Sequence, residues 1–479
     1  MSLSHDHVKE VRDPIYGFIK LSEAEWDIVN CPEFQRLRDI RQLAMGHLVY
    51  PGANHTRFEH SLGCLHLATL MFDSLVERDA KVLEDEFGLP ENARERARQV
   101  LRLAALLHDL GHPPFSHSGE GLLPVKKDPR TGDVTDNPTT GKPARFDHEE
   151  MTALIVRDST VGEKIDSHFK SHGIDKEEVI AVATDVKHTD PEPYSLLLHD
   201  MLAGEVGADR VDYLLRDAYH SGQKVGDFDY RRLIGTLMMV PPPKEAETGP
   251  RIGFDDGGWL VAEQMIVARY LMYQSLYFHK TKRIFEVHLE RFMQEWLKGK
   301  FGAPELPSTV DRYVRLSDSN VLAAISRAAC DTKAAGHDEA CRFRDRSHAR
   351  LAKELILADN YRLSKDRRIP IKERFDKLKS DVRAKFDTGV LSDEPDRSAT
   401  QIFEQSPQIW VQLDGTTRYL GEISEIVRGM ADKIWRGRIY ADAARRKEVK
   451  CFCEKWLEDN PAERYRTEGA RDGAVAEES

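Results

Sequence analysis

The sequence lacks long apolar runs. Its most apolar stretches, such as residues 103–107, are far shorter than the ~20 residues that a bilayer-spanning helix needs. It also lacks an excess of basic residues, because 70 Lys and Arg stand against 81 Asp and Glu, for a net charge of -11. We therefore expect no membrane partner. The charge balance does not indicate nucleic-acid binding, although it leaves room for a local basic pocket that takes a phosphorylated small molecule.

Cysteine is scarce as well, with six residues in the chain. Only Cys451 and Cys453 lie close together, as C-F-C, and this spacing is not typical of zinc ligands. The N-terminal segment MSLSHDHVKEVRD contains no apolar signal core. These observations predict reduced thiols in a cytoplasmic protein.

Strand patterns are few and short, so the predicted fold class is mostly α, with several helices and a few short strands. The 22–43 stretch opens with a capping-box spacing, Ser22 and Glu25. Apolar residues at helical intervals predict helices over 22–43, 61–77, 91–110, 196–218 and 259–297. Strands are predicted over 15–21 and as a hairpin of 251–254 with 259–262, joined by D-D-G-G.

Two segments carry side chains suited to a metal ion. His108 and Asp109 follow an almost wholly apolar helical stretch, where an unpaired imidazole or carboxylate is costly to bury. Upstream, H-T-R-F-E-H-S-L-G places Arg57 and His60 three residues apart, on one helical face. Taken alone, the His-Asp pair is weak evidence, because a hydrogen-bonded core histidine explains it equally well.

A third segment strengthens the metal interpretation. In G-A-D-R-V-D-Y-L-L-R-D-A, the residues Asp209, Tyr213 and Asp217 recur every four positions and form one stripe along a helix. Two imidazoles and two carboxylates suit Fe, Mn, Ni, Co or Zn and leave coordination positions open for water and substrate. Open positions are typical of a catalytic rather than a structural site.

These segments belong to a longer ordered series of motifs. Between about residues 8 and 355 the chain reads D-P-I-Y-G-F-I, F-Q-R-L-R-D-I-R-Q-L, Y-P-G-A-N-H-T-R-F-E-H-S-L-G, H-D-L-G-H-P-P-F-S-H, F-D-H-E, A-D-R-V-D-Y-L-L-R-D and Y-Q-S-L-Y-F-H-K. In this order the motifs resemble those of HD-domain deoxynucleoside triphosphate triphosphohydrolases, the dGTPase-like and SAM-and-HD-domain dNTPases. We recognise no separate SAM domain.

The resemblance implies a phosphohydrolase core over 1–355, with the HD motifs in 55–220 and a helical continuation in 259–355. Beyond it, composition predicts a charged helical region over 356–462 and a disordered tail over 463–479. The implied cofactor is one divalent transition metal ion, with Mg²⁺ a further candidate for the substrate phosphates. The implied metal ligands are His60, His108, Asp109 and Asp209.

The remaining site residues are also implied by the resemblance. The implied reaction is attack of water on the α-phosphorus of a deoxynucleoside triphosphate, which releases deoxynucleoside and tripolyphosphate. Implied catalytic residues are His112, His117, Glu120 and His148, with His117 as the proton donor to the leaving oxygen. Implied substrate-binding residues are Arg57, Arg210 and Arg269 for the phosphates, and Gln42, Leu43, Tyr213, Asp217 and Tyr277 for the sugar and base.

Two other functions stay open at this point. One is a different HD phosphohydrolase, which acts on nucleoside monophosphates, alarmones or oligonucleotides. The other is a nucleotide-sensing protein with little turnover. The resemblance further implies a homo-oligomer, a dimer or a tetramer, whereas base preference, metal identity and any activating nucleotide are not specified by the residues.

Overall fold

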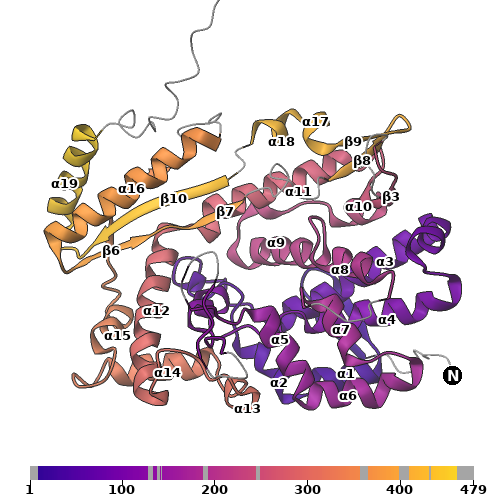
Figure 1. Cartoon of the computed structure of the whole chain (residues 1–479), viewed down its shortest axis with the longest axis horizontal. Helices are drawn as coiled ribbons and strands as arrows, with labels where there is room; N and C mark the ends of the chain where they lie inside the picture. Colours follow the sequence, from indigo (N-terminus) through magenta and orange to yellow (C-terminus); the bar gives the residue numbers. More distant parts are fainter. Residues whose placement is uncertain are drawn as a thin grey trace, which may run out of the picture.

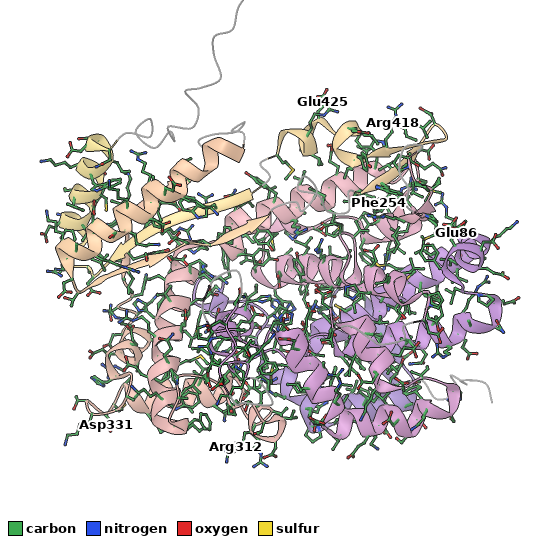
Figure 2. The ribbon with its side chains drawn as sticks, in the orientation of Figure 1. Glu86, Phe254, Arg312, Asp331, Arg418 and Glu425 are labelled. Atoms are coloured by element: carbon green, nitrogen blue, oxygen red, sulfur yellow. The ribbon has the colours of Figure 1, made fainter. Side chains whose placement is uncertain are left out.

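The computed structural model describes residues 9–127, 133–137, 141, 143–186, 192–243, 249–356, 365–398, 409–430 and 433–460. Helices dominate these residues and strands are short, which confirms the predicted mostly α class (Figure 1). Charged side chains such as Glu86, Arg312 and Arg418 point outward, whereas Phe254 is buried (Figure 2). Among the described helices, none has both the length and the apolar content needed to cross a membrane.

The N-terminal segment forms a hairpin, β1 (Lys9–Asp13) with β2 (Gly17–Leu21), followed by short helices. The predicted single helix over 22–43 is wrong. The structure instead has α1 (Glu23–Val29), α2 (Pro32–Gln35) and a 3-10 turn over 36–39. Pro32 explains the break, because proline lacks the N–H that would continue α1 yet suits the first turn of a new helix. The capping box at the start of α1 is present.

A bundle of helices follows and holds most of the large buried core (Figure 1). The long α3 (Arg57–Phe87) packs on α4 (Glu91–Leu107) and α9 (Ala208–Ser221). Gly63 permits the close approach of α3 to α9, since an added Cβ would lie 1.9 Å from Asp212 Oδ1. Around these three helices lie α5 (His148–Arg157), α6 (Thr160–Phe169), α7 (Lys176–Ala183), α8 (Ser195–Ala203) and α10 (Tyr230–Gly235).

The predicted hairpin of 251–254 with 259–262 is also wrong. Strand β4 (Arg251–Phe254) pairs instead with β3 (Leu237–Val240), and Trp259 begins α11 (Trp259–Met272). The D-D-G-G segment is therefore the turn that leads into a helix. Helix α11 continues through a π-helical turn over 273–277 to α12 (Lys280–Phe301), which breaks the helix predicted over 259–297.

The rest of the described chain contains more strand than the sequence patterns predict. After α13 (Val310–Tyr313), α14 (Asp318–Ala328) and α15 (His337–Arg344), two four-stranded sheets form. One sheet contains β5 (Arg350–Ile356), β6 (Val390–Asp393), β7 (Asp396–Ser398) and β10 (Lys433–Ala441), and it lies against α16 (Lys365–Phe386) and α19 (Arg446–Asp459) (Figure 1). In the other, β8 (Trp410–Leu413) and β9 (Thr416–Tyr419), followed by α17 (Leu420–Ile423) and α18 (Glu425–Gly429), extend β3–β4.

The region after 356 therefore contributes to two cores. Strand β8 lies beside β4 in the large core, whereas α16, α19 and β10 surround a smaller one around Phe375 and Trp435. The division at about 355 stays a prediction. The tail predicted over 463–479 lies outside the described residues.

Candidate active site

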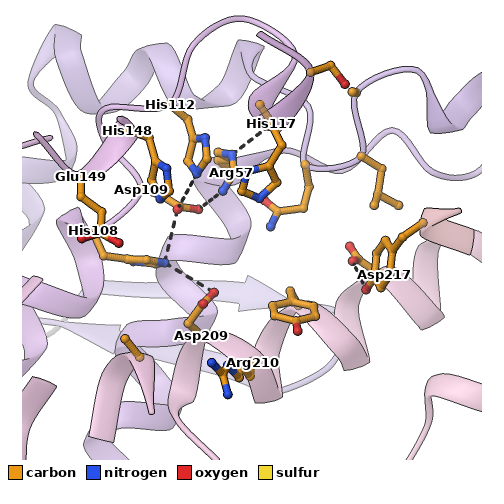
Figure 3. Close-up of a pocket in the computed structure, with 18 of the residues that line it drawn as sticks. Arg57, His108, Asp109, His112, His117, His148, Glu149, Asp209, Arg210 and Asp217 are labelled. Carbon is orange, nitrogen blue, oxygen red and sulfur yellow. Dashed lines mark hydrogen bonds and ion pairs between the residues drawn. The ribbon is translucent and has the colours of Figure 1, made fainter. Parts of the chain in front are cut away.

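A cavity of about 350 Å³ opens between α3, α9 and α11, a size that suits a small-molecule ligand (Figure 3). The structure gathers at its wall residues that are far apart in sequence. The predicted residues that line it are Gln42, Leu43, Arg57, His108, Asp109, His112, His117, His148, Asp209, Arg210, Tyr213, Asp217, Arg269 and Tyr277. Of the other two predicted residues, His60 is fully buried behind Asp109 and Asp209, and Glu120 lies against His117.

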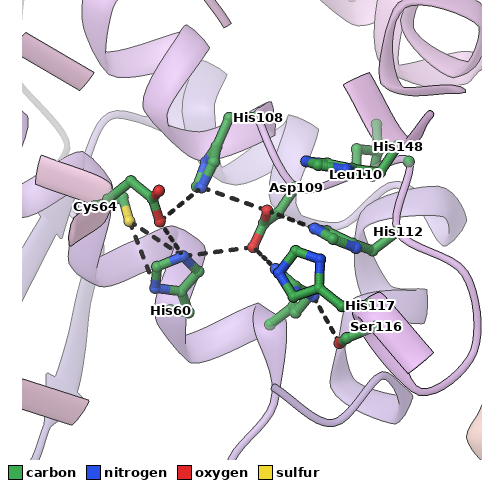
Figure 4. Close-up of polar contacts among 12 residues, drawn as sticks. His60, Cys64, His108, Asp109, Leu110, His112, Ser116, His117 and His148 are labelled. Atoms are coloured by element: carbon green, nitrogen blue, oxygen red, sulfur yellow. Dashed lines mark hydrogen bonds and ion pairs between the residues drawn. The ribbon is translucent and has the colours of Figure 1, made fainter. Parts of the chain in front are cut away.

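The four predicted metal ligands meet at one end of this cavity. His60 Nε2 lies 3.4 Å from Asp109 Oδ2 and 3.1 Å from Asp209 Oδ1 (Figure 4). His108 Nε2 lies 3.5 Å from Asp109 Oδ1 and 3.7 Å from Asp209 Oδ1. Ligand atoms at roughly 2.0–2.3 Å from a shared ion are themselves about 3 to 4 Å apart, so each histidine lies at a suitable distance from both carboxylates to share an ion with them. Cys64 Sγ also lies within 4.8 Å of the ligand atoms of His60, His108 and Asp209, and it is a further candidate ligand that was not predicted.

Local sequence explains this convergence. Helix α4 is buried along its last two turns and ends at His108, which delivers the His-Asp pair to the core. A capping box of Thr56 and Glu59 starts α3, so His60 falls in its first turns. Helix α9 begins just before Asp209, which therefore lies in the first turn, where the helix dipole favours a carboxylate.

Hydrogen bonds behind the ligands fix the ring nitrogens that face the site. His60 Nδ1 donates to Asp212 Oδ2 at 2.7 Å, and His108 Nδ1 donates to the carbonyl of Ala105 at 2.9 Å. Both rings thus present an Nε2 lone pair. His108 Nε2 is buried and has no hydrogen-bond partner among the described residues. Such an orphaned acceptor fits a metal ion, as does the set of two imidazoles and two carboxylates.

The surroundings of Asp209 and Asp212 favour the ionised form of both carboxyl groups. Burial opposes ionisation of Asp209, but the closeness of His108 and His60 holds its pKa well below the usual range. Asp212 behaves similarly, since burial is outweighed by Arg216 and His60, and its pKa is lowered to about 2. Both carboxylates are therefore ionised at neutral pH and available to a cation or its supporting histidine.

A second group of histidines lies beside the metal end. His117 Nδ1 and His148 Nδ1 approach the same oxygen, Glu120 Oε1, at 2.9 and 2.8 Å. The ring of His112 stacks on that of His148 at 4.0 Å between centroids. Burial acts against the charge on Glu120, yet contact with His117 and His148 holds its pKa far below the ordinary value. Burial lowers the pKa of His148, whereas the contact with Glu120 raises it. The net result is a pKa above the ordinary value for histidine.

The predicted phosphate-binding arginines are held in place by carboxylates. Arg57 contacts Asp109 and donates from Nε to Ser116 Oγ at 2.8 Å. Arg210 and Arg269 lie on either side of Glu205 Oε2, at 2.6 and 3.2 Å. Their guanidinium groups converge on the cavity from α9 and α11.

The far end of the cavity is formed by Asp217 and two tyrosines. Asp217 Oδ1 lies 2.7 Å from His55 Nε2, and Oδ2 accepts a hydrogen bond from Tyr277 Oη at 2.7 Å. The rings of Tyr213 and Tyr277 meet edge to face at 6.2 Å. Nearby, Gln42 Oε1 is buried without a hydrogen-bond partner among the described residues, so it can accept a hydrogen bond from a ligand.

Several residues in this arrangement were not predicted, and three of them hold predicted site residues in place. His55 stands at the start of H-T-R-F-E-H, Asp212 follows Asp209 by three positions, and Glu205 precedes Asp209 by four. Position within a recognised motif could have indicated His55 and Asp212. No sequence pattern indicates Glu205, because one of its partners, Arg269, lies 64 residues away.

Two family models and several known proteins match this chain. Residues 57–191 match the HD domain family and residues 228–466 match the HD associated region. The uncharacterized protein MJ1154 of Methanocaldococcus jannaschii is 30% identical over 325 residues, covering 67% of this chain and 58% of that protein. The deoxynucleoside triphosphate triphosphohydrolase SAMHD1 of Gallus gallus is 28% identical over 344 residues, covering 66% and 52%.

A solved structure is similar over nearly its whole length. A hypothetical protein from Aquifex aeolicus superposes with a TM-score of 0.68 at 28% identity, covering 93% of this chain and 99% of that one. By contrast, the chain spans only about 55–58% of the length of the curated relatives matched first.

Proposed function

Because the chain belongs to the HD-domain family, we propose that it hydrolyses deoxynucleoside triphosphates to deoxynucleoside and tripolyphosphate with the help of one divalent metal ion. The observation that carries the proposal is the order of groups along the cavity. The candidate metal ligands lie at one end and the tyrosine-aspartate group at the other, so a nucleotide whose α-phosphate meets the metal can lay its sugar over Tyr213. Arg210 and Arg269 reach the same cavity from α9 and α11, where they can bind the remaining phosphates.

The residues have distinct roles in this proposal. A divalent ion held by His60, His108, Asp109 and Asp209 supplies Lewis acidity toward a phosphoryl oxygen. Arg210 and Arg269 bind the phosphates through forked N–H donors. His117 donates its proton to the leaving oxygen of the deoxynucleoside, and its contact with Glu120 orients the ring for that transfer.

The sugar lies along α9 toward Asp217. Asp209, Tyr213 and Asp217 occupy one stripe of this helix, so a nucleotide whose phosphate meets the metal end extends its sugar over Tyr213. Asp217 accepts the 3′-hydroxyl, because each carboxylate oxygen has acceptor capacity beyond the bonds from His55 and Tyr277. A 2′-hydroxyl pressed against the ring would lose its hydrogen bonds to water, at a cost of about 1–3 kcal/mol.

The test is product analysis with each dNTP and each NTP in the presence of Mn²⁺, Mg²⁺ or Co²⁺, resolved by chromatography. We expect tripolyphosphate, and at least about a tenfold preference for dNTP over NTP, since 1.4 kcal/mol corresponds to a factor of about ten. Tyr213→Ala should narrow that ratio and keep the metal content. Equal hydrolysis of ATP and dATP, or release of orthophosphate, would favour another HD phosphohydrolase. Binding of dNTP without any product would favour a sensor.

A further inference from the structure

The second histidine group has the composition of a metal site in its own right. Its members come from the segment after α4 and from the start of α5: His112, His117, Glu120 and His148. One ligand atom from each lies within 4.8 Å of the others. Three imidazoles and a carboxylate are the donor set that Zn²⁺ and similar ions prefer.

The orientation of His112 supplies an independent reason for a cation there. Its Nε2 faces Asp109 Oδ1 at 3.3 Å and its Nδ1 faces Glu120 Oε1 at 3.8 Å. The side chain is 1% exposed, and Nδ1 has no hydrogen-bond partner among the described residues. With the ring proton on Nε2 for Asp109, a lone pair on Nδ1 faces a carboxylate oxygen. A nitrogen lone pair and a carboxylate oxygen are both acceptors, and a cation between them would satisfy both.

An ion can also reach this group from solvent. The side chain of His117 is 56% exposed, and the histidines line the same open cavity as the metal ligands (Figures 3 and 4). His117 and His148 direct Nδ1 toward the same carboxylate oxygen as His112 does, so the four ligand atoms already converge. When an ion binds, the protons between nitrogen and oxygen leave, and the two nitrogens draw back from 2.8 and 2.9 Å to the separation of about 3 to 4 Å between ligands of one ion.

We propose that His112, His117, Glu120 and His148 form a second divalent-cation site of the Zn²⁺ type, and that its occupation switches off the proton donor. The inhibitory part rests on the proposed function. An imidazolium has a pKa near 6.5 and is a good proton donor near neutral pH. Once Nδ1 of His117 is bound to an ion, the ring is a neutral ligand, and its remaining N–H is a far weaker acid.

The test counts metal ions in the full-length protein by mass spectrometry after dialysis against micromolar Zn²⁺. We expect two ions per chain in the wild type and one in His148→Ala and in Glu120→Gln. His199→Ala is the matched control, because His199 lines the same cavity but binds the Val182 carbonyl through Nδ1, away from the group. This control should keep two ions. Far-ultraviolet circular dichroism verifies that each variant is folded.

A second measurement follows turnover during the same titration. We expect an enzyme with its first ion in place to lose at least about tenfold in dNTP hydrolysis as the second ion binds, with recovery after mild chelation. One ion per chain at saturating Zn²⁺, or two ions in both Glu120→Gln and His148→Ala, would overturn the site. A rise in turnover as the second ion binds would overturn the switch. Two ions in a protein that hydrolyses no dNTP would refute the proposed function and leave the site standing.

Discussion

Two aspartate-histidine pairs connect α9 to the start of α3. They differ in which of the two side chains faces the cavity and which one supports it. Asp212 meets His60 and Asp217 meets His55, each at 2.7 Å, and the partners are five residues apart on both segments. In the first pair Asp212 supports the His60 ring from behind, and His60 Nε2 faces the candidate metal ligand Asp209. In the second pair the histidine lies behind and Asp217 lines the cavity.

All four side chains are almost fully buried, so the groups around each pair, and not burial, assign the roles. The other nitrogen of His60 faces two carboxylates, so a cation can join the group. The other nitrogen of His55 is buried without a hydrogen-bond partner among the described residues, and its ring stacks on His220. His55 is therefore a support. Six substitutions, grouped in four predictions, can break or sharpen this distinction.

The largest effect is expected from exchanging the two histidines in turn for alanine. His60→Ala should lose the bound ion, and its rate of hydrolysis should fall by about 10³-fold or more. A metal ion stabilises the transition state by several kcal/mol, and each ~1.4 kcal/mol is a factor of ten in rate. His55→Ala should keep the ion. Elemental analysis and initial rates measure both outcomes. A fully loaded His60→Ala protein would contradict the ligand assignment.

His117→Ala should have the next largest effect. It tests proton transfer independently of the two pairs, because His117 belongs to neither of them. We expect turnover to fall by about 10²-fold or more, in the range for general acid catalysis. The ion at His60 and His108 should remain, because His117 contacts Glu120 and not these ligands. Single-turnover rates with dNTP and elemental analysis test this prediction. Unchanged turnover would remove His117 from the mechanism.

The candidate metal ligands could be named from the sequence because each lies in a contiguous motif that carries the family resemblance. His108 and Asp109 follow an apolar helix, and Asp209, Tyr213 and Asp217 recur with helical periodicity, so these motifs can be recognised locally although the His-Asp pair alone is weak evidence. The Asp217–His55 pair spans 162 residues, and no local pattern encodes such a contact. The same holds for the shared contact of Glu205 with Arg210 and Arg269.

Errors in the predicted elements have a similar cause. D-D-G-G has the residues of a hairpin turn, but Thr236 and Phe254 pack around Gly258 and the chain enters α11 there. The actual partner of β4, residues 237–240, lies before a Pro-rich stretch that hides the pairing. The strands after 356 were missed because the charged residues around them resemble a solvated helix, whereas burial of Trp435 and Tyr440 is decided by tertiary packing.

A smaller effect is expected from the aspartates of the two pairs. Asp212→Asn should weaken metal affinity by about 10- to 100-fold, the usual effect of removing a carboxylate behind a ligating histidine. Asp217→Asn should leave metal affinity unchanged and reduce recognition of the sugar instead. Competition with a metal chelator measures both affinities. Because Asp212 also binds Arg216, thermal unfolding is the necessary control. Equal loss of metal in the two variants would erase the distinction between the pairs.

The smallest effect should come from Tyr277→Phe, which removes one hydroxyl beside the second pair. Tyr277 Oη donates to Asp217 Oδ2 at 2.7 Å, and a hydrogen bond to a charged group contributes about 1.5–3 kcal/mol. Part of that is recovered when solvent or the sugar occupies the vacated position, so we expect KM for dNTP to rise by about tenfold or less. Metal content should not change, because neither Asp217 nor its partner His55 is a candidate metal ligand.

Comparing dNTP with 2′,3′-dideoxynucleotides locates the effect. The wild type should prefer the substrate with a 3′-hydroxyl, and the variant should prefer it less. A variant that loses its ion, or that keeps the full preference, would contradict the proposed role of the Tyr277 hydroxyl, which is to hold Asp217 for the sugar.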